Sequence, residues 1–262
     1  MSICAVLWCP DRLLKDWNSL NKPLQDGKQQ VRHIVFLCGL LSDKLVWQKV
    51  ADHLQDDFDC SIISFAGFNS LAEMAKAVLE QAPPRFILIG HSMGGRVALE
   101  AYRQSPDRIE LLGLFNTGAH PLKEGEKTAR QTFLDLANKE GMETLANAWL
   151  TPMMGATALQ DQHLIQRLKQ MVTRYSLQQL TDQIQALLLR PEVESLLPAI
   201  KVPVLLVAAD EDKWSPLEQH QAMAEHIAVN ELQLMHDAGH MAPVEKPGAA
   251  ATIIGDFIAR HK

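Results

Sequence analysis

The sequence predicts an α/β protein with a mostly parallel central sheet, flanking helices and one helical insertion. Between residues 31 and 116, short apolar runs alternate with segments of helical spacing. These runs are apolar throughout instead of at every second position, as expected of parallel strands that are covered on both faces. Residues 119–195 interrupt the alternation because they contain no strand-like run. A covered parallel sheet that carries a helical insertion explains all three observations.

Each predicted strand is a run of apolar, often β-branched residues that ends at a glycine, a proline or a polar turn. In chain order these runs cover residues 3–9, 31–38, 60–65, 86–89, 109–116, 202–209 and 231–236. The spacing of apolar residues predicts helices over 45–54, 70–81, 93–104 and 249–261. Ser70 has Glu73 three residues after it, which is the spacing of a capping box.

The insertion holds amphipathic stretches over 125–139, 142–150, 158–172 and 177–189. Prolines at 152 and 191 break the helical pattern between or after these stretches. We therefore expect two parts. Residues 1–118 and 196–262 form the core, and residues 119–195 form a helical cap that lies over the active site.

Composition excludes several classes of protein. The chain has 262 residues, of which 47% are hydrophobic and 21% charged, with a formal net charge of −6. No block of lysine and arginine suggests a nucleic-acid partner. No stretch reaches the roughly 18 apolar residues of a membrane span, and the N-terminus lacks the basic region of a signal peptide. We expect a cytoplasmic protein.

The cysteines do not suggest a metal site or a disulfide framework. Cys4, Cys9, Cys38 and Cys60 lie in apolar contexts without CxxC spacing. Buried free thiols are the favoured interpretation, and we expect neither a metal nor a cofactor.

The strongest local signal is the G-x-S-x-G motif centred on Ser92. It directly follows an apolar strand and opens a helix, which is the setting of a nucleophile elbow. The sharp turn would raise the Ser92 hydroxyl above the sheet edge, and the backbone N–H of Met93 would point at a developing oxyanion. Gly39, after the strand at 31–38, allows close backbone approach, so the N–H of Leu40 would be the second donor.

A serine hydroxyl needs a base, and His240 is the best of the ten histidines. It follows the last predicted strand, so it lies at the same edge of the sheet as Ser92. The imidazole needs an acid in turn. Asp210, Glu211 and Asp212 all leave the strand at 202–209. Their position alone does not choose between Asp210 and Asp212, but the chain order Ser, Asp, His suits this arrangement.

These motifs resemble the α/β-hydrolase superfamily, in its capped serine-hydrolase branch of carboxylesterases and pimeloyl-carrier-protein methyl esterases. The resemblance covers residues 31–262. It rests on Gly39 followed by Trp47, the elbow at 90–95, the acid turn ending at Pro216, and Gly239-His240 followed by Glu245 and Pro247. The family's acid turn often reads G-x-x-D-x-x-x-P, which selects Asp212 although Ala209 replaces the glycine. The family often has His-Gly at the oxyanion loop, where this chain has Cys38-Gly39.

The resemblance implies a serine hydrolase of small-molecule carboxylic esters or thioesters, because relatives that use an aspartate nucleophile do other chemistry. Trp149, Met153, Met154 and Trp214 are expected to line a pocket for small to medium apolar acyl groups. A carbon–carbon bond hydrolase or lyase is an alternative. It would need polar groups facing Ser92, for which Arg130, His163 and Arg174 are available. A catalytically silent binding protein of the same fold is the third hypothesis.

Overall fold

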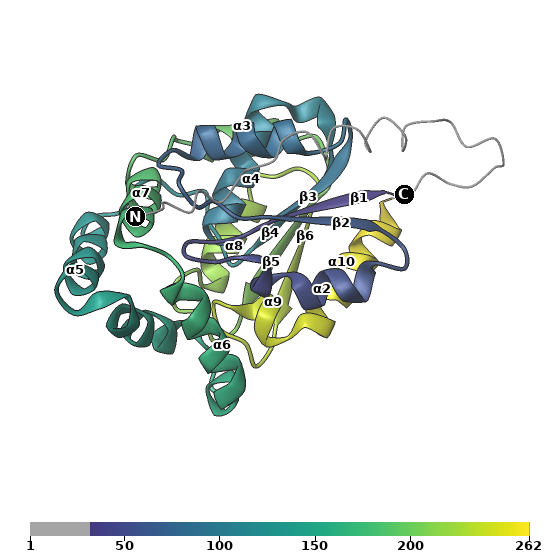
Figure 1. Ribbon diagram of the computed structural model, residues 1–262. Coiled ribbons are helices and arrows are strands. Elements are labelled where there is room, and N and C mark those ends of the chain that lie inside the picture. Colours follow the sequence, from purple (N-terminus) through teal and green to yellow (C-terminus); the bar gives the residue numbers. More distant parts are fainter. Residues whose placement is uncertain (1–31, 262) are drawn as a thin grey trace, which may run out of the picture. The chain divides into compact units, whose positions relative to one another are not determined.

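The computed structural model describes residues 32–261, and Figure 1 shows their arrangement. The predicted strand at 3–9, with Cys4 and Cys9, lies outside the described residues. Cys38 and Cys60 are free thiols; Cys38 is buried, as expected, whereas Cys60 is only partly buried.

A single sheet of parallel strands confirms the predicted α/β architecture. Its order is β2-β1-β3-β4-β5-β6, and neighbouring strands pair in parallel. The strands are β1 (His33–Leu37), β2 (Asp59–Ile63), β3 (Phe86–His91), β4 (Ile109–Phe115), β5 (Val204–Ala209) and β6 (Asn230–Met235). Strands β3 and β5 are buried along their whole length, as continuous apolar runs predict.

Helices cover both faces of the sheet. The helices outside the segment between β4 and β5 are α2 (Gln48–Leu54), α3 (Leu71–Gln81), α4 (Met93–Gln104), α8 (Leu217–Ala224), α9 (Ala242–Glu245) and α10 (Pro247–Arg260). Helices α3 and α4 pack together, as do α2 and α10, and Figure 1 shows these two pairs on opposite sides of the sheet. Helix α8 packs against β5 and β6.

The segment between β4 and β5 is helical, in agreement with the absence of strand-like runs there. Its helices are α5 (Glu126–Leu150), α6 (Gln162–Thr173) and α7 (Leu177–Leu188), and both α6 and α7 pack against α5. Gly141 has non-helical backbone angles inside α5 (φ 87°, ψ 168°), so α5 consists of two helices joined at a kink, in agreement with the two stretches predicted there. The division into core and cap domains stays a prediction.

Helix starts differ from prediction in two places. Ser70 is the N-cap residue of α3, but its side chain makes no capping hydrogen bond. A complete capping box occurs instead in α7, between Ser176 and Gln179. The predicted helix at 45–54 is split, because Asp43 caps a short 3-10 turn and α2 starts only after Trp47. The Trp47 indole N–H donates to the carbonyl of Leu37 (3.0 Å) and so anchors this turn to the end of β1.

Candidate active site

Ser92 lies on a strained turn between β3 and α4. Its backbone has φ 55° and ψ −117°, a conformation that costs a non-glycine residue on the order of 1–3 kcal/mol. Two hydrogen bonds hold it there. The Ser92 N–H donates to the carbonyl of Phe115 (3.0 Å), and the Thr117 hydroxyl donates to the carbonyl of Ser92 (2.7 Å). The end of β4 therefore fixes the turn that β3 begins.

The glycines of the motif are required by close backbone approach. A side chain at Gly90 would collide with the backbone of Gly94, and one at Gly94 would collide with the carbonyl of Leu37. The G-x-S-x-G pattern is therefore a packing requirement of this turn.

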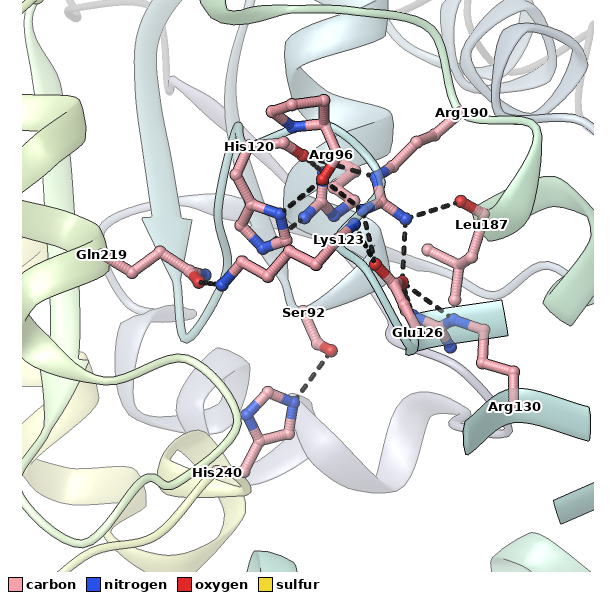
Figure 2. Close-up of polar contacts among 11 residues, drawn as sticks. Ser92, Arg96, His120, Lys123, Glu126, Arg130, Leu187, Arg190, Gln219 and His240 are labelled. Atoms are coloured by element: carbon pink, nitrogen blue, oxygen red, sulfur yellow. Dashed lines mark hydrogen bonds and ion pairs between the residues drawn. The ribbon is translucent and has the colours of Figure 1, made fainter. Parts of the chain in front are cut away.

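The structure brings Ser92, His240 and Asp212 into one hydrogen-bonded chain. The Ser92 hydroxyl lies 2.9 Å from His240 Nε2, as Figure 2 shows, and His240 Nδ1 lies 2.9 Å from Asp212 Oδ2. The His240 and Asp212 side chains are almost completely buried, at 4% and 0% exposure. An imidazole held between a serine hydroxyl and a carboxylate can take a proton from the hydroxyl, and the carboxylate stabilises the resulting cation.

Asp212 is held as a carboxylate by several donors. The N–H groups of Trp214 and Ser215 donate to Oδ1 (2.8 and 3.0 Å), and the Asn116 amide donates to Oδ2 (3.0 Å). Burial opposes the charge, but His240 and these donors outweigh it, so the pKa of Asp212 is well below its ordinary value. Asp210 points elsewhere: it accepts from His236 (3.1 Å) and from backbone N–H groups.

The expected oxyanion donors lie beside Ser92. Leu40 and Met93 line the same cavity as Ser92, and neither N–H donates to another group of residues 32–261. Gln183 of α7 fixes the loop that carries Leu40. Its side-chain oxygen accepts from the N–H of Leu41 (2.8 Å), and its amide nitrogen donates to the carbonyl of Phe65 (2.9 Å).

Two aromatic side chains hold the loop and ring of His240. His91 Nε2 donates to the carbonyl of His240 (2.7 Å), which directs the His91 ring away from the Ser92 hydroxyl. Burial lowers the pKa of His91 to about 3, so this ring is neutral. The Trp214 ring lies 5.9 Å from the His240 ring, where its face can stabilise an imidazolium.

A cavity of about 580 Å³ opens onto Ser92 and His240. Trp149, Met153 and Trp214 line it, together with Phe133, which sequence analysis did not single out. The rings of Phe133 and Trp214 stack with centroids 6.1 Å apart. Met154 is buried but does not line this cavity.

The cavity also has basic side chains. Arg130 lines it, whereas His163 and Arg174 do not, and Arg174 pairs with Asp43 instead. Arg96, one turn after Ser92 on α4, and Lys123 also line the cavity, and neither was predicted. Arg96 had an available signal, because a residue four positions after a helix-opening nucleophile lies on the same helix face.

Within residues 32–261 no group of histidine, cysteine or carboxylate side chains is suited to hold a metal ion. None of the helices described here combines the length and apolar character that a membrane crossing requires.

Known proteins resemble this chain over most of its length. A model of the alpha/beta hydrolase family matches residues 34–252. The chain is 25% identical over 258 residues to 2-succinyl-6-hydroxy-2,4-cyclohexadiene-1-carboxylate synthase of Enterobacter sp. (strain 638), covering 91% of this chain and 96% of the relative.

Two solved structures share the fold. The first is a thermophilic esterase from Thermogutta terrifontis with malate bound, at TM-score 0.79 and 24% identity, covering 88% of this chain and 91% of that one. The second is an enol-lactonase from Burkholderia xenovorans LB400, at TM-score 0.80 and 21% identity, covering 89% of this chain and 94% of that one.

Proposed function

Because the chain belongs to the alpha/beta hydrolase family, we propose that it is a serine hydrolase that cleaves carboxylic esters or thioesters through an acyl-enzyme. The observation that carries the proposal is the continuous hydrogen-bonded chain from Ser92 through His240 to Asp212. In this proposal Ser92 is the nucleophile, His240 is the base and then the acid, and Asp212 orients His240 and stabilises its cation.

In the first step, Ser92 Oγ bonds to the carbonyl carbon while His240 Nε2 takes the hydroxyl proton. The carbonyl oxygen becomes an oxyanion and accepts hydrogen bonds from the N–H groups of Leu40 and Met93. When the intermediate collapses, the bond to the alcohol or thiol breaks and His240 returns the proton to that leaving group. An acyl-enzyme ester on Ser92 remains.

In the second step, water attacks the acyl carbon and His240 takes one of its protons. Collapse of the second intermediate returns that proton to Ser92 Oγ and releases the carboxylic acid. The same oxyanion donors serve both steps. The apolar wall of Trp149, Met153 and Trp214 would receive small to medium apolar parts of the acyl group.

A lyase or carbon–carbon hydrolase that uses the same three residues is a second candidate. Two observations favour it: the curated relative is a synthase, and Arg130 supplies a polar group to the cavity. Such an enzyme would have an activated Ser92 but would not turn over simple esters.

The test combines labelling with turnover. The protein is treated with a fluorophosphonate probe, the adduct is located, and wild type and Ser92→Ala are compared on 4-nitrophenyl esters of increasing acyl length. We expect labelling at Ser92 and a loss of turnover in the variant on the order of 10⁶-fold.

Two outcomes contradict the ester hydrolase. Labelling of Ser92 without ester turnover favours the lyase or carbon–carbon hydrolase. A folded protein that is not labelled favours a catalytically silent binding protein.

A further inference from the structure

Arg96 is a cation at the cavity wall that has no carboxylate partner within the part of the chain that the structure describes. Its guanidinium donates to the carbonyl of His120 (3.1 Å) and lies 3.0 Å from His120 Nε2. His120 Nδ1 contacts the carbonyl of Pro121 (2.8 Å), so Nδ1 carries the proton and Nε2 accepts from Arg96. No acidic side chain of residues 32–261 lies within ion-pair distance of Arg96.

The neighbouring carboxylate, Glu126, is already shared by two other arginines. Arg190 binds both of its oxygens (2.8 and 2.7 Å) and is 2% exposed, so its role is structural. Arg130 contacts one of these oxygens through Nε and Nη2 (2.9 and 2.7 Å). Its Nη1 has no hydrogen-bond partner among the described residues, and Arg130 lines the cavity.

The wall of the cavity therefore has excess positive charge. Its charged residues are Arg96, Lys123, Arg130 and Lys213 against Glu124 and Glu126. Burial lowers the pKa of His120 to about 4, so His120 adds no charge at pH 7. Burial and repulsion from Arg190 lower the pKa of Arg96 to about 9, and Arg96 is therefore still a cation at pH 7. The chain as a whole has a net charge of −6, so this excess is local to the cavity.

The excess charge lies on one side of the nucleophile. We call Arg96, Lys123 and Arg130 the basic cluster. In Figure 2 Arg96 and His240 lie on opposite sides of the Ser92 hydroxyl. In the proposed mechanism, His240 Nε2 must reach the leaving group to protonate it, so the alcohol occupies the His240 side. The acyl group then extends towards the basic cluster.

We propose that the basic cluster binds a carboxylate at the far end of the acyl group, so that the substrate is a half-ester or half-thioester of a dicarboxylic acid. The guanidinium donors of Arg96 and the remaining Nη1 of Arg130 can donate to a carboxylate, which reduces the excess positive charge of the wall. Water cleaves the ester bond, and the products are the alcohol or thiol and the dicarboxylate. This inference rests on the proposed hydrolase.

The experiment compares substrates that differ in one charge. Mono-4-nitrophenyl esters of adipic, suberic and sebacic acids are assayed beside the same compounds with the free carboxylate methylated. In wild type we expect kcat/KM to be at least tenfold higher for the charged ester at one or more of these lengths. Arg96→Gln should lower kcat/KM for the preferred charged ester about 10- to 100-fold more than it lowers kcat/KM for the methylated counterpart.

Three controls keep the result interpretable. Arg96→Lys retains the charge and should recover part of the preference for the charged ester. The readout is the ratio of kcat/KM for the charged ester to kcat/KM for the neutral ester, because a misfolded fraction of the protein does not change that ratio. Lys127→Gln removes an exposed charge from the same helix as Arg130, outside the cavity, and should leave the ratio unchanged. Adipate should inhibit neutral-ester turnover competitively in wild type and weakly in Arg96→Gln.

Several results would overturn the inference. If both esters turn over equally at every length, the hydrolase stands and the carboxylate site is wrong. If neither ester reacts, the proposed function fails with it. A third result concerns an ester whose carboxylate is on the alcohol part. If kcat/KM is higher for 3-carboxy-4-nitrophenyl hexanoate than for 4-nitrophenyl hexanoate, and Arg96→Gln removes this difference, the anion binds on the alcohol side and the assignment to the acyl group is wrong.

Discussion

Replacing Asp212 by asparagine should abolish most activity without unfolding the protein. Oδ1 of Asp212 accepts hydrogen bonds from the N–H groups of Trp214 and Ser215, so the amide oxygen of the new side chain must take that position. The amide nitrogen then takes the place of Oδ2 and donates to His240 Nδ1. The imidazole proton is forced onto Nε2, which faces the Ser92 hydroxyl and can no longer accept its proton.

The fold has a way to accommodate this change. The Asn116 amide oxygen is buried and has no hydrogen-bond partner among residues 32–261, so rotating that amide offers an acceptor to the amide nitrogen introduced by the substitution. We expect the melting temperature to change little. The loss in kcat should approach 10⁴-fold, the magnitude expected when a triad histidine is held in the wrong tautomer, or about 5.5 kcal/mol of transition-state stabilisation.

The assay measures kcat and kcat/KM on a 4-nitrophenyl ester, with circular dichroism and thermal melting to verify folding. Asp210→Asn is the matched control, because Asp210 lies two residues earlier and contacts His236 instead of His240. Its kcat/KM should stay within about threefold of wild type. If Asp210→Asn loses more activity than Asp212→Asn, the assignment of the acid is wrong.

Two further changes test stability. Burial opposes ionisation of Glu126, but Arg190 and Arg130 outweigh it and lower its pKa to about 2. Because the unfolded value is about 4.3, the carboxylate stabilises the fold above that pH and loses this effect as the pH falls towards 2. Glu126→Gln should lower the free energy of unfolding, measured in urea, by about 3 kcal/mol at pH 7 and by less at pH 3. An equal loss of stability at both pH values would exclude an ionic origin. Gln183→Met should leave the Leu41 N–H and the Phe65 carbonyl without hydrogen bonds. We expect the free energy of unfolding to fall by about 3 kcal/mol and kcat to fall as well. Gln185 is exposed on the same helix, and Gln185→Met should change neither quantity.

The parts of this protein that sequence predicts well are those determined locally. Continuous apolar runs predict β3 and β5 because both faces of each strand are covered. The elbow at Ser92 is predictable because Gly90 and Gly94 meet backbone that lies only a few residues away or in the adjacent strand. His240 follows from its position after the last strand, since parallel strands end at one edge of the sheet.

The parts that sequence does not determine depend on contacts between distant segments. Asp210 and Asp212 follow the same strand, and only the direction of the turn decides which one meets His240. Gln183 contacts Leu41 across 142 positions of the chain, and no local pattern indicates that contact. Ser70 has the spacing of a capping box but no capping bond, because spacing alone does not fix the side-chain rotamer.

The position of Arg96 has a consequence for the length of the substrate. Arg96 and Ser92 belong to the same helix end, four residues apart, so their backbones are separated by about 6 Å of helix rise. That separation depends on α4 and on the packing of β3, both of which are buried in the core. Arg130 comes instead from α5 and is oriented by Glu126. The core would therefore set the minimum distance between the reacting carbonyl and the carboxylate, and the inserted helices would supply the second contact to that carboxylate.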